Sequence, residues 1–126
     1  MEIRILLIDD DQEFLEQSKL LWEKQGEGVG IDIFSDPIKA LDKMENTDYD
    51  AIVADYKMPE MDGLEILKVI RDRGDKTPFI ILTGKGGEEI AMEALNLEAD
   101  KYIIKGTDPK EQYKKIIDTI FDRPIS

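Results

Sequence analysis

Carboxylates, a hydroxyl and an ammonium directly follow four short apolar segments of the sequence. The segments and the residues that follow them are 3–8 with Asp9 and Asp10, 51–54 with Asp55, 79–82 with Thr83, and 102–104 with Lys105. Apolar segments of this length, separated by helical stretches, are typical of buried parallel strands. In an open parallel sheet the carboxyl ends of the strands lie on one edge, where ligands bind. The sequence therefore predicts an edge suited to a divalent cation and a phosphoryl group.

The carboxylates of Asp9, Asp10 and Asp55 are expected to converge at this edge. Unpaired like charges raise one another's pKa, and a hard cation such as Mg²⁺ removes the conflict because it prefers oxygen ligands. The alternative is that Asp9 to Asp11 only cap the next helix and that Asp55 only begins a turn. Helix capping explains Asp11 well. It explains less well why acids also end the other central strand.

Thr83 and Lys105 have both a functional and an ordinary interpretation. A threonine hydroxyl can donate to a phosphoryl oxygen, and a lysine ammonium supplies a compact positive charge to acids or a phosphoryl group. Alternatively, Thr83 only enters a glycine-rich loop and Lys105 is one of many solvated lysines. The order of the residues along the chain favours function, because only the second strand lacks such a terminus.

The periodicity alternates strand and helix five times. The second strand, residues 30–35, alternates apolar and polar positions up to Phe34, which predicts an edge strand with one wetter face. We therefore expect an α/β protein with a parallel five-stranded sheet in the order 2-1-3-4-5 and right-handed crossovers. This is a (βα)5 three-layer sandwich of the flavodoxin-like type. Its topological switch point lies between the strands that end at Asp10 and Asp55.

Apolar spacing and capping signals place the helices. The first is expected to run to about Gly26, the second to begin at Asp36-Pro37, and the last at the Asp108–Glu111 capping sequence. The residues expected on the inner helical faces are Phe14, Leu15, Leu21 and Trp22; Ile38, Leu41 and Met44; Leu64, Leu67 and Ile70; Ile90, Ala91, Ala94 and Leu95; and Tyr113, Ile116, Ile117, Ile120 and Phe121.

Length and composition narrow the class of protein. The 126 residues, 41% of them apolar, predict a single domain over residues 1–126 with a packed core. The chain has no cysteine and no histidine, which excludes thiolate metal sites, a histidine base and a zincin site. The net charge of −12 should repel the phosphate backbone of nucleic acid. No apolar run approaches the ~20 residues of a membrane helix, so we expect a cytoplasmic protein with no membrane partner.

Four stretches of the chain resemble the receiver domain of two-component response regulators. They are Ile5–Asp11, Asp55–Gly63, Ile81–Thr83 and Tyr102–Lys105. The second, Asp-x-x-Met-Pro-x-Met-Asp-Gly after an apolar strand, is close to diagnostic of this family. The resemblance covers essentially the full length of the chain.

The resemblance implies a role for each residue. Asp55 would accept a phosphoryl group from a phosphohistidine, and Thr83 and Lys105 would contact its oxygens. Asp10, Asp9 and Asp55, with the backbone carbonyl of Lys57, would bind Mg²⁺. Thr83 and Tyr102 would be the switch residues, and the alternative for Tyr102 is that it only packs as part of its strand. The residues with these implied roles are Asp9, Asp10, Asp55, Lys57, Thr83, Tyr102 and Lys105.

The implied output is signalling rather than enzymatic turnover. The partner would be a sensor histidine kinase or a phosphotransfer protein, and phosphorylation would alter the face formed by the helix after Gly87, strand 102–104 and the last helix. That face could also form a homodimer. Direct binding of nucleic acid is not expected.

Two positions depart from the family pattern. Gly106 follows Lys105 where the family usually has proline, so this chain lacks the proline that would help to fix the direction of the lysine. Lys57 is an unusual residue at its position, and it could pair with Asp9 or the phosphoryl group, or extend into solvent.

Three other functions are compatible with parts of the pattern. A degenerate receiver would act only as a binding module. A haloacid-dehalogenase-type phosphatase also begins with Asp-x-Asp, but it leaves Asp55 without a role. A flavodoxin-type FMN site shares the fold, but its phosphate would lie against three aspartates, which would repel it.

Overall fold

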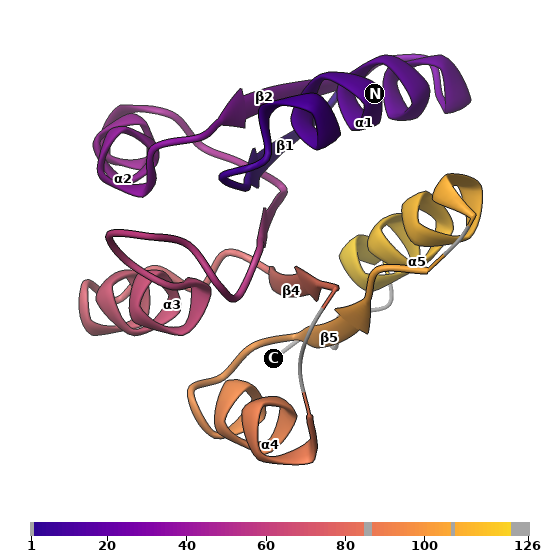
Figure 1. Cartoon of the computed structure of the whole chain (residues 1–126). Coiled ribbons are helices and arrows are strands. Elements are labelled where there is room, and N and C mark those ends of the chain that lie inside the picture. The colour runs from indigo at the N-terminus through magenta and orange to yellow at the C-terminus, as the bar shows by residue number, and fades with distance from the viewer. Residues whose placement is uncertain (1, 85–86, 107, 122–126) are drawn as a thin grey trace.

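The computed structural model describes residues 2–84, 87–106 and 108–121, in which five strands alternate with five helices (Figure 1). The elements are β1 Ile3–Ile8, α1 Gln12–Gln25, β2 Val29–Phe34, α2 Pro37–Asn46, β3 Ala51–Ala54, α3 Gly63–Asp72, β4 Phe79–Thr83, α4 Glu88–Asn96, β5 Lys101–Ile104 and α5 Pro109–Phe121. The expected alternation of strands and helices is confirmed.

The sheet has the predicted strand order, and this order brings the central strand ends together. All neighbouring strands are parallel, in the order β2-β1-β3-β4-β5. Ile8 lies opposite Ala54 in the register of β1 and β3, and the backbone N–H of Asp55 donates to the carbonyl of Ile8 at 2.9 Å. The residues after β1 and β3 therefore begin their loops side by side.

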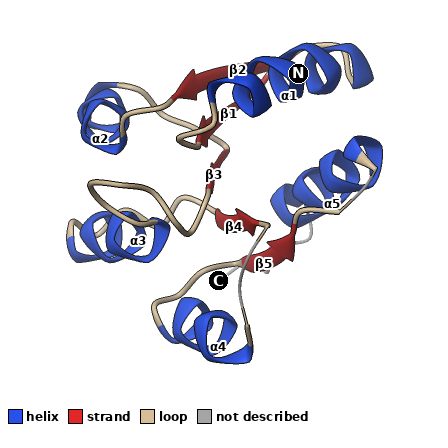
Figure 2. Ribbon diagram, in the orientation of Figure 1, coloured by secondary structure: helices blue, strands red, loops and turns tan. Residues whose placement is uncertain are grey.

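Alternate residues of the central strands point into two separate cores. In β1, Leu6 and Ile8 pack with α2, α3 and α4, whereas Ile5 and Leu7 pack with α1 and α5. The sheet is thus covered on both faces, as parallel sheets generally are. Figure 2 shows the strands between these two helical layers. The predicted three-layer sandwich is confirmed.

Aspartates begin four of the helices, and at α5 the carboxylate of Asp108 accepts from the N–H of Lys110 at 2.9 Å. Asp11 caps α1 by accepting from the N–H of Phe14, and Asp36 caps α2 with proline at the first helical position. Asp62 and Glu65 form a reciprocal capping box at α3 that the sequence analysis did not identify. Each aspartate satisfies an N–H group that has no partner within the helix.

Four apolar residues that were expected inside are exposed. They are Leu21, Ile38, Leu95 and Phe121, with 39%, 45%, 58% and 55% of their surface accessible. In α1 the buried face is Leu15, Ser18 and Trp22. Leu21 is adjacent to Trp22 in sequence, and adjacent residues of a helix point about 100° apart, so both cannot face the sheet. The apolar surface of these helices is wider than the surface that the sheet covers.

Two side-chain networks hold the periphery of the sheet. At the edge strand β2, the carboxylate of Glu23 accepts from the N–H of Ile31 at 2.9 Å, and Lys19 donates to the carbonyl of Ile31. At the end of the sheet where β4 and β5 begin, Arg71 donates to the carbonyls of Asp75, Thr77 and Glu98. Arg71 thereby connects the end of α3 to the loops that precede β4 and β5.

None of the described helices has the length and apolar composition that crossing a bilayer requires.

Candidate functional site

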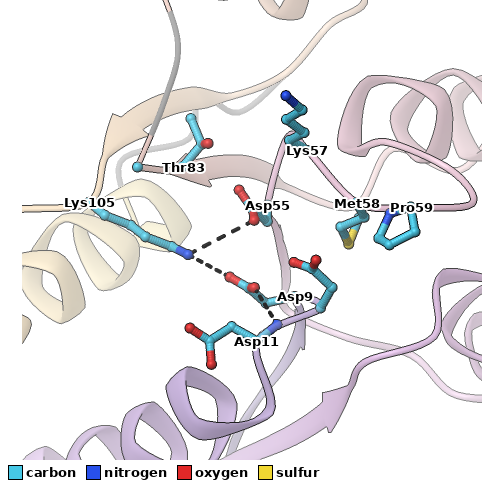
Figure 3. A pocket seen from close by; sticks show the side chains of 10 residues that line it. Asp9, Asp11, Asp55, Lys57, Met58, Pro59, Thr83 and Lys105 are labelled. Carbon is cyan, nitrogen blue, oxygen red and sulfur yellow. Dashed lines mark hydrogen bonds and ion pairs between the residues drawn. The ribbon is translucent and has the colours of Figure 1, made fainter.

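A pocket opens at the carboxyl edge of the sheet, between the loops that follow β1, β3, β4 and β5 (Figure 3). The residues that line it are Asp9, Asp10, Asp11, Asp55, Lys57, Met58, Pro59, Thr83, Gly84 and Lys105. The structure therefore brings the predicted strand-end residues to one place.

Three carboxylates in the pocket are close enough to share a cation. Asp9, Asp10 and Asp55 each offer an oxygen, and these oxygens all lie within 4.8 Å of one another. Asp9 is 1% exposed and Asp55 is 9% exposed, whereas Asp10 is open to solvent. An all-oxygen set with one open side fits a hard divalent ion such as Mg²⁺, which retains waters and accepts further oxygen ligands.

Lys105 supplies the positive charge that partly balances these acids. Its Nζ lies 2.7 Å from Oδ2 of Asp9 and 4.0 Å from Oδ2 of Asp55 (Figure 3). The same Nζ lies 4.0 Å from the centroid of the Phe14 ring. The ammonium is thus held among two carboxylates and an aromatic face.

Burial shapes the acidity of Asp9. Removal of its carboxylate from water raises its pKa, and the nearby charge of Asp55 acts in the same direction. The hydrogen bond from Lys105 and the N–H of Asp11, at 2.9 Å from Oδ1, oppose this rise without cancelling it. Asp9 is therefore a carboxylate for which additional positive charge is favourable.

The backbone around Asp55 is fixed by a close approach of α3. A Cβ added to Gly63 would lie 2.4 Å from the carbonyl oxygen of Asp55, and the N–H of Gly63 donates to the carbonyl of Tyr56 at 2.9 Å. Met58, between them in the loop, is buried in the core under the pocket. The Met-Pro-x-Met-Asp-Gly segment therefore packs the start of α3 against the backbone of Asp55.

The remaining strand-end residues occupy distinct positions. Thr83 is 2% exposed at the end of β4, and its carbonyl accepts from the N–H of Lys105 at 2.8 Å. Lys57 is exposed, and in Figure 3 its side chain points away from Asp9 and Asp55. Asp11 has the capping role that sequence analysis allowed for it.

Gln112 is a site-supporting residue that the sequence analysis missed. Its side chain is 6% exposed, and Nε2 donates to the carbonyl of Gly106 at 3.1 Å. This bond joins the first turns of α5 to the residue after Lys105, where the family usually has proline. The only signal in the sequence was a polar residue on the inner stripe of an amphipathic helix.

Tyr102 is turned toward the core between the sheet and α4. Its ring packs against the cluster that includes Ala94 and Ile81, and its hydroxyl is buried beside the backbone of Gly87. Burial raises the pKa of this phenol.

Comparison with known proteins gives consistent matches. The family described as "Response regulator receiver domain" matches residues 5–117. The response regulator MprA of Mycobacterium sp. (strain KMS) is 34% identical over 105 residues, which cover 83% of this chain and 45% of that protein. The chain therefore spans about half the length of this curated relative.

Solved structures share the whole fold. The CheY-like receiver domain protein of Methanospirillum hungatei JF-1 is 30% identical, with a TM-score of 0.88 over 97% of this chain and 96% of that one. The receiver domain of the Francisella response regulator 1452 is 28% identical, with a TM-score of 0.86 over 96% of this chain and 98% of that one.

Proposed function

The chain belongs to the family of response regulator receiver domains, and from this membership we propose that Asp55 is its phosphoacceptor in a two-component system. The observation that carries the proposal is the cluster of Asp9, Asp10 and Asp55, with carboxylate oxygens within 4.8 Å of one another and Lys105 beside them. A carboxylate cluster with an adjacent ammonium suits phosphoryl transfer, which depends on positioning and on neutralising charge. Family membership leaves the phosphatase and FMN alternatives without support.

The proposed reaction is a displacement at phosphorus. An oxygen of the Asp55 carboxylate attacks the phosphorus of a phosphohistidine on the partner kinase or phosphotransfer protein. The P–O bond forms as the P–N bond breaks, and the histidine nitrogen keeps the electron pair. The product is an aspartyl phosphate, a mixed anhydride that water later hydrolyses to return Asp55 to its free form.

The surrounding residues have separate proposed roles. Lys105 turns from the carboxylates toward a phosphoryl oxygen, and the Thr83 hydroxyl donates to another. Asp9, Asp10 and Asp55, with the backbone carbonyl of Lys57, hold Mg²⁺. When bound, that ion lowers the repulsion between the carboxylates and the incoming phosphoryl group.

We propose that Thr83 and Tyr102 carry the signal to the face formed by α4, β5 and α5. Movement of Thr83 toward a phosphoryl group would shift the loop that leads to α4, which contacts β5. This face exposes Met92, Leu95 and Ile104, with 64%, 58% and 52% of their surface accessible. Such an apolar face suits a homodimer or an effector partner. The strong negative charge disfavours direct contact with nucleic acid.

The decisive experiment is phosphorylation by a small donor. The protein is incubated with Mg²⁺ and acetyl phosphate, and its intact mass is measured. We expect one phosphoryl adduct that is labile to base and that is missing in Asp55→Asn and without Mg²⁺. Asp36→Asn is the matched control, because it makes the same change at a helix cap away from the pocket.

Two results would contradict the proposal. An adduct that persists in Asp55→Asn would place the acceptor elsewhere. A wild-type protein that takes up no phosphoryl group, but still binds its partner, would favour the degenerate receiver.

A further inference from the structure

We propose that Phe14 is a positioning residue for Lys105, with its aromatic face holding the ammonium where it can turn from the carboxylates to the phosphoryl group. This inference rests on the proposed role of Lys105 in phosphoryl transfer. It concerns a residue in the first turn of α1 that lies outside the set of strand-end residues.

The first turn of α1 fixes the place of the ring. The carboxylate of Asp11 accepts from the N–H of Phe14 at 3.1 Å, so the helix cap holds the backbone of Phe14 directly. The ring is half-buried and packs against the core between the sheet, α1 and α5. An aromatic side chain held at both its backbone and its ring has little freedom to move away.

The ammonium of Lys105 has three close neighbours of different character. Asp9 lies at 2.7 Å, Asp55 at 4.0 Å and the centroid of the Phe14 ring at 4.0 Å. A cation within about 6 Å of a ring centroid is attracted by the negative face of the ring. The lysine side chain is 21% exposed, so the ring also replaces part of the water around the charge.

The neutral character of the ring matters for the reaction. Both carboxylates would take new partners with a metal ion bound and with Asp55 phosphorylated, so neither could support Lys105 throughout. The ring attracts the ammonium without neutralising its charge, which leaves that charge available to a phosphoryl oxygen.

This support matters because the lysine itself does not fix the place of its ammonium. Its side chain has a flexible four-carbon stem. The residue after it is Gly106 rather than a proline, whose ring would fix the backbone φ angle. The backbone there is held by the bond from Gln112 to the Gly106 carbonyl, which orients the peptide but not the end of the lysine.

The test compares Phe14→Leu, which removes the ring, with Phe14→Tyr, which keeps it. The phosphorylation rate is measured with acetyl phosphate at saturating Mg²⁺. The attraction between a partly desolvated cation and an aromatic face is equivalent to about a tenfold change in an equilibrium constant. We therefore expect Phe14→Leu to be about tenfold slower and Phe14→Tyr to stay near the wild-type rate.

A spectroscopic readout separates positioning from packing. Protons above an aromatic ring are shifted upfield, so the ε-CH2 protons of Lys105 should be shifted in the wild type and in Phe14→Tyr, and not in Phe14→Leu. The upfield shift can be measured in the wild type alone, so it tests whether the ring contacts Lys105 even if Phe14→Leu fails to fold.

Each outcome has a definite meaning. Equal rates for wild type and a folded Phe14→Leu, an equal loss of rate in both variants, or no upfield shift in the wild type would overturn the inference. A wild-type protein that accepts no phosphoryl group would refute the proposed function instead, and the upfield shift would still test whether the ring holds the ammonium.

Discussion

Replacement of Gly63 by alanine tests how closely α3 must approach the residue that we propose as phosphoacceptor. The added Cβ would lie 2.4 Å from the carbonyl oxygen of Asp55 and 3.1 Å from Cδ1 of Ile81. Ordinary contact begins at 3.4 Å, so α3 and the Asp55 backbone would have to separate by about 1 Å. The obstacle is backbone, which cannot rotate away as a side chain can.

Two effects of opposite sign decide the stability of Gly63→Ala. Alanine is favoured over glycine inside a helix by up to ~1 kcal/mol. Forcing an extra carbon into a packed site costs ~1–3 kcal/mol, and a backbone obstacle puts the cost near the upper end. We expect a net loss of about 2 kcal/mol, or a fall in Tm of roughly 6–10 °C for a chain of this size. A displacement of ~1 Å at the acceptor should also slow phosphorylation about 100-fold.

Thermal and urea denaturation measure the loss of stability, and the acetyl phosphate reaction measures the loss of phosphorylation rate. Gly30→Ala is the matched control, because within the described part of the chain no atom except those of its chain neighbours lies within 4 Å of its added Cβ. We expect it to be as stable as the wild type or more stable by up to ~1 kcal/mol. If Gly63→Ala were as stable and as reactive as Gly30→Ala, the reasoning from this close approach would be wrong.

Three further predictions concern the networks around the sheet. Arg71→Lys should lower the free energy of unfolding by ~1–3 kcal/mol in urea denaturation, because a single ammonium cannot reach all three backbone carbonyls to which the planar guanidinium donates. The exposed change Arg73→Lys should alter it by less than ~0.5 kcal/mol. Burial opposes ionisation of Glu23, but the bonds from Ile31 and Lys19 outweigh it, and the pKa of Glu23 is lowered from 4.5. The ionised Glu23 therefore stabilises the fold above pH 4.5, and this contribution is lost as the pH falls below that value. Urea denaturation should accordingly find Glu23→Gln less stable than wild type at neutral pH and nearly equal to it near pH ~3; a difference independent of pH would contradict the assignment. Gln112→Leu leaves the Gly106 carbonyl without its donor, and the phosphorylation rate should fall several-fold with a stability loss of only ~1 kcal/mol; an unchanged rate would show that the orientation of the peptide after Lys105 does not affect the reaction.

The strand order and the strand-end cluster could be predicted from the sequence because they depend on simple patterns. Buried parallel strands are apolar along their length, and their shared carboxyl edge follows from parallel pairing. Asp9, Asp55, Thr83 and Lys105 therefore meet as expected at one pocket.

The details that were missed depend on geometry that sequence patterns do not encode. The buried stripe of α1 is narrower than its apolar pattern predicts, since Leu21 is as apolar as its buried neighbours and only the extent of the sheet leaves it exposed. The contact between Phe14 and Lys105 joins residues that are 91 positions apart. The bond from Gln112 to Gly106 involves a polar side chain whose burial becomes visible only after α5 has been placed against the sheet.

The bonds from Lys19 and Glu23 to Ile31 have a consequence for the protein at high concentration. An unpaired edge strand is a template on which strands of other molecules add, and this is a common start of aggregation. In β2 both backbone groups of Ile31 are already bonded to charged side chains of the protein's own α1. A strand from a second molecule would have to displace an ion pair to extend the sheet at this position. Helix α1 therefore protects this edge of the sheet against intermolecular growth.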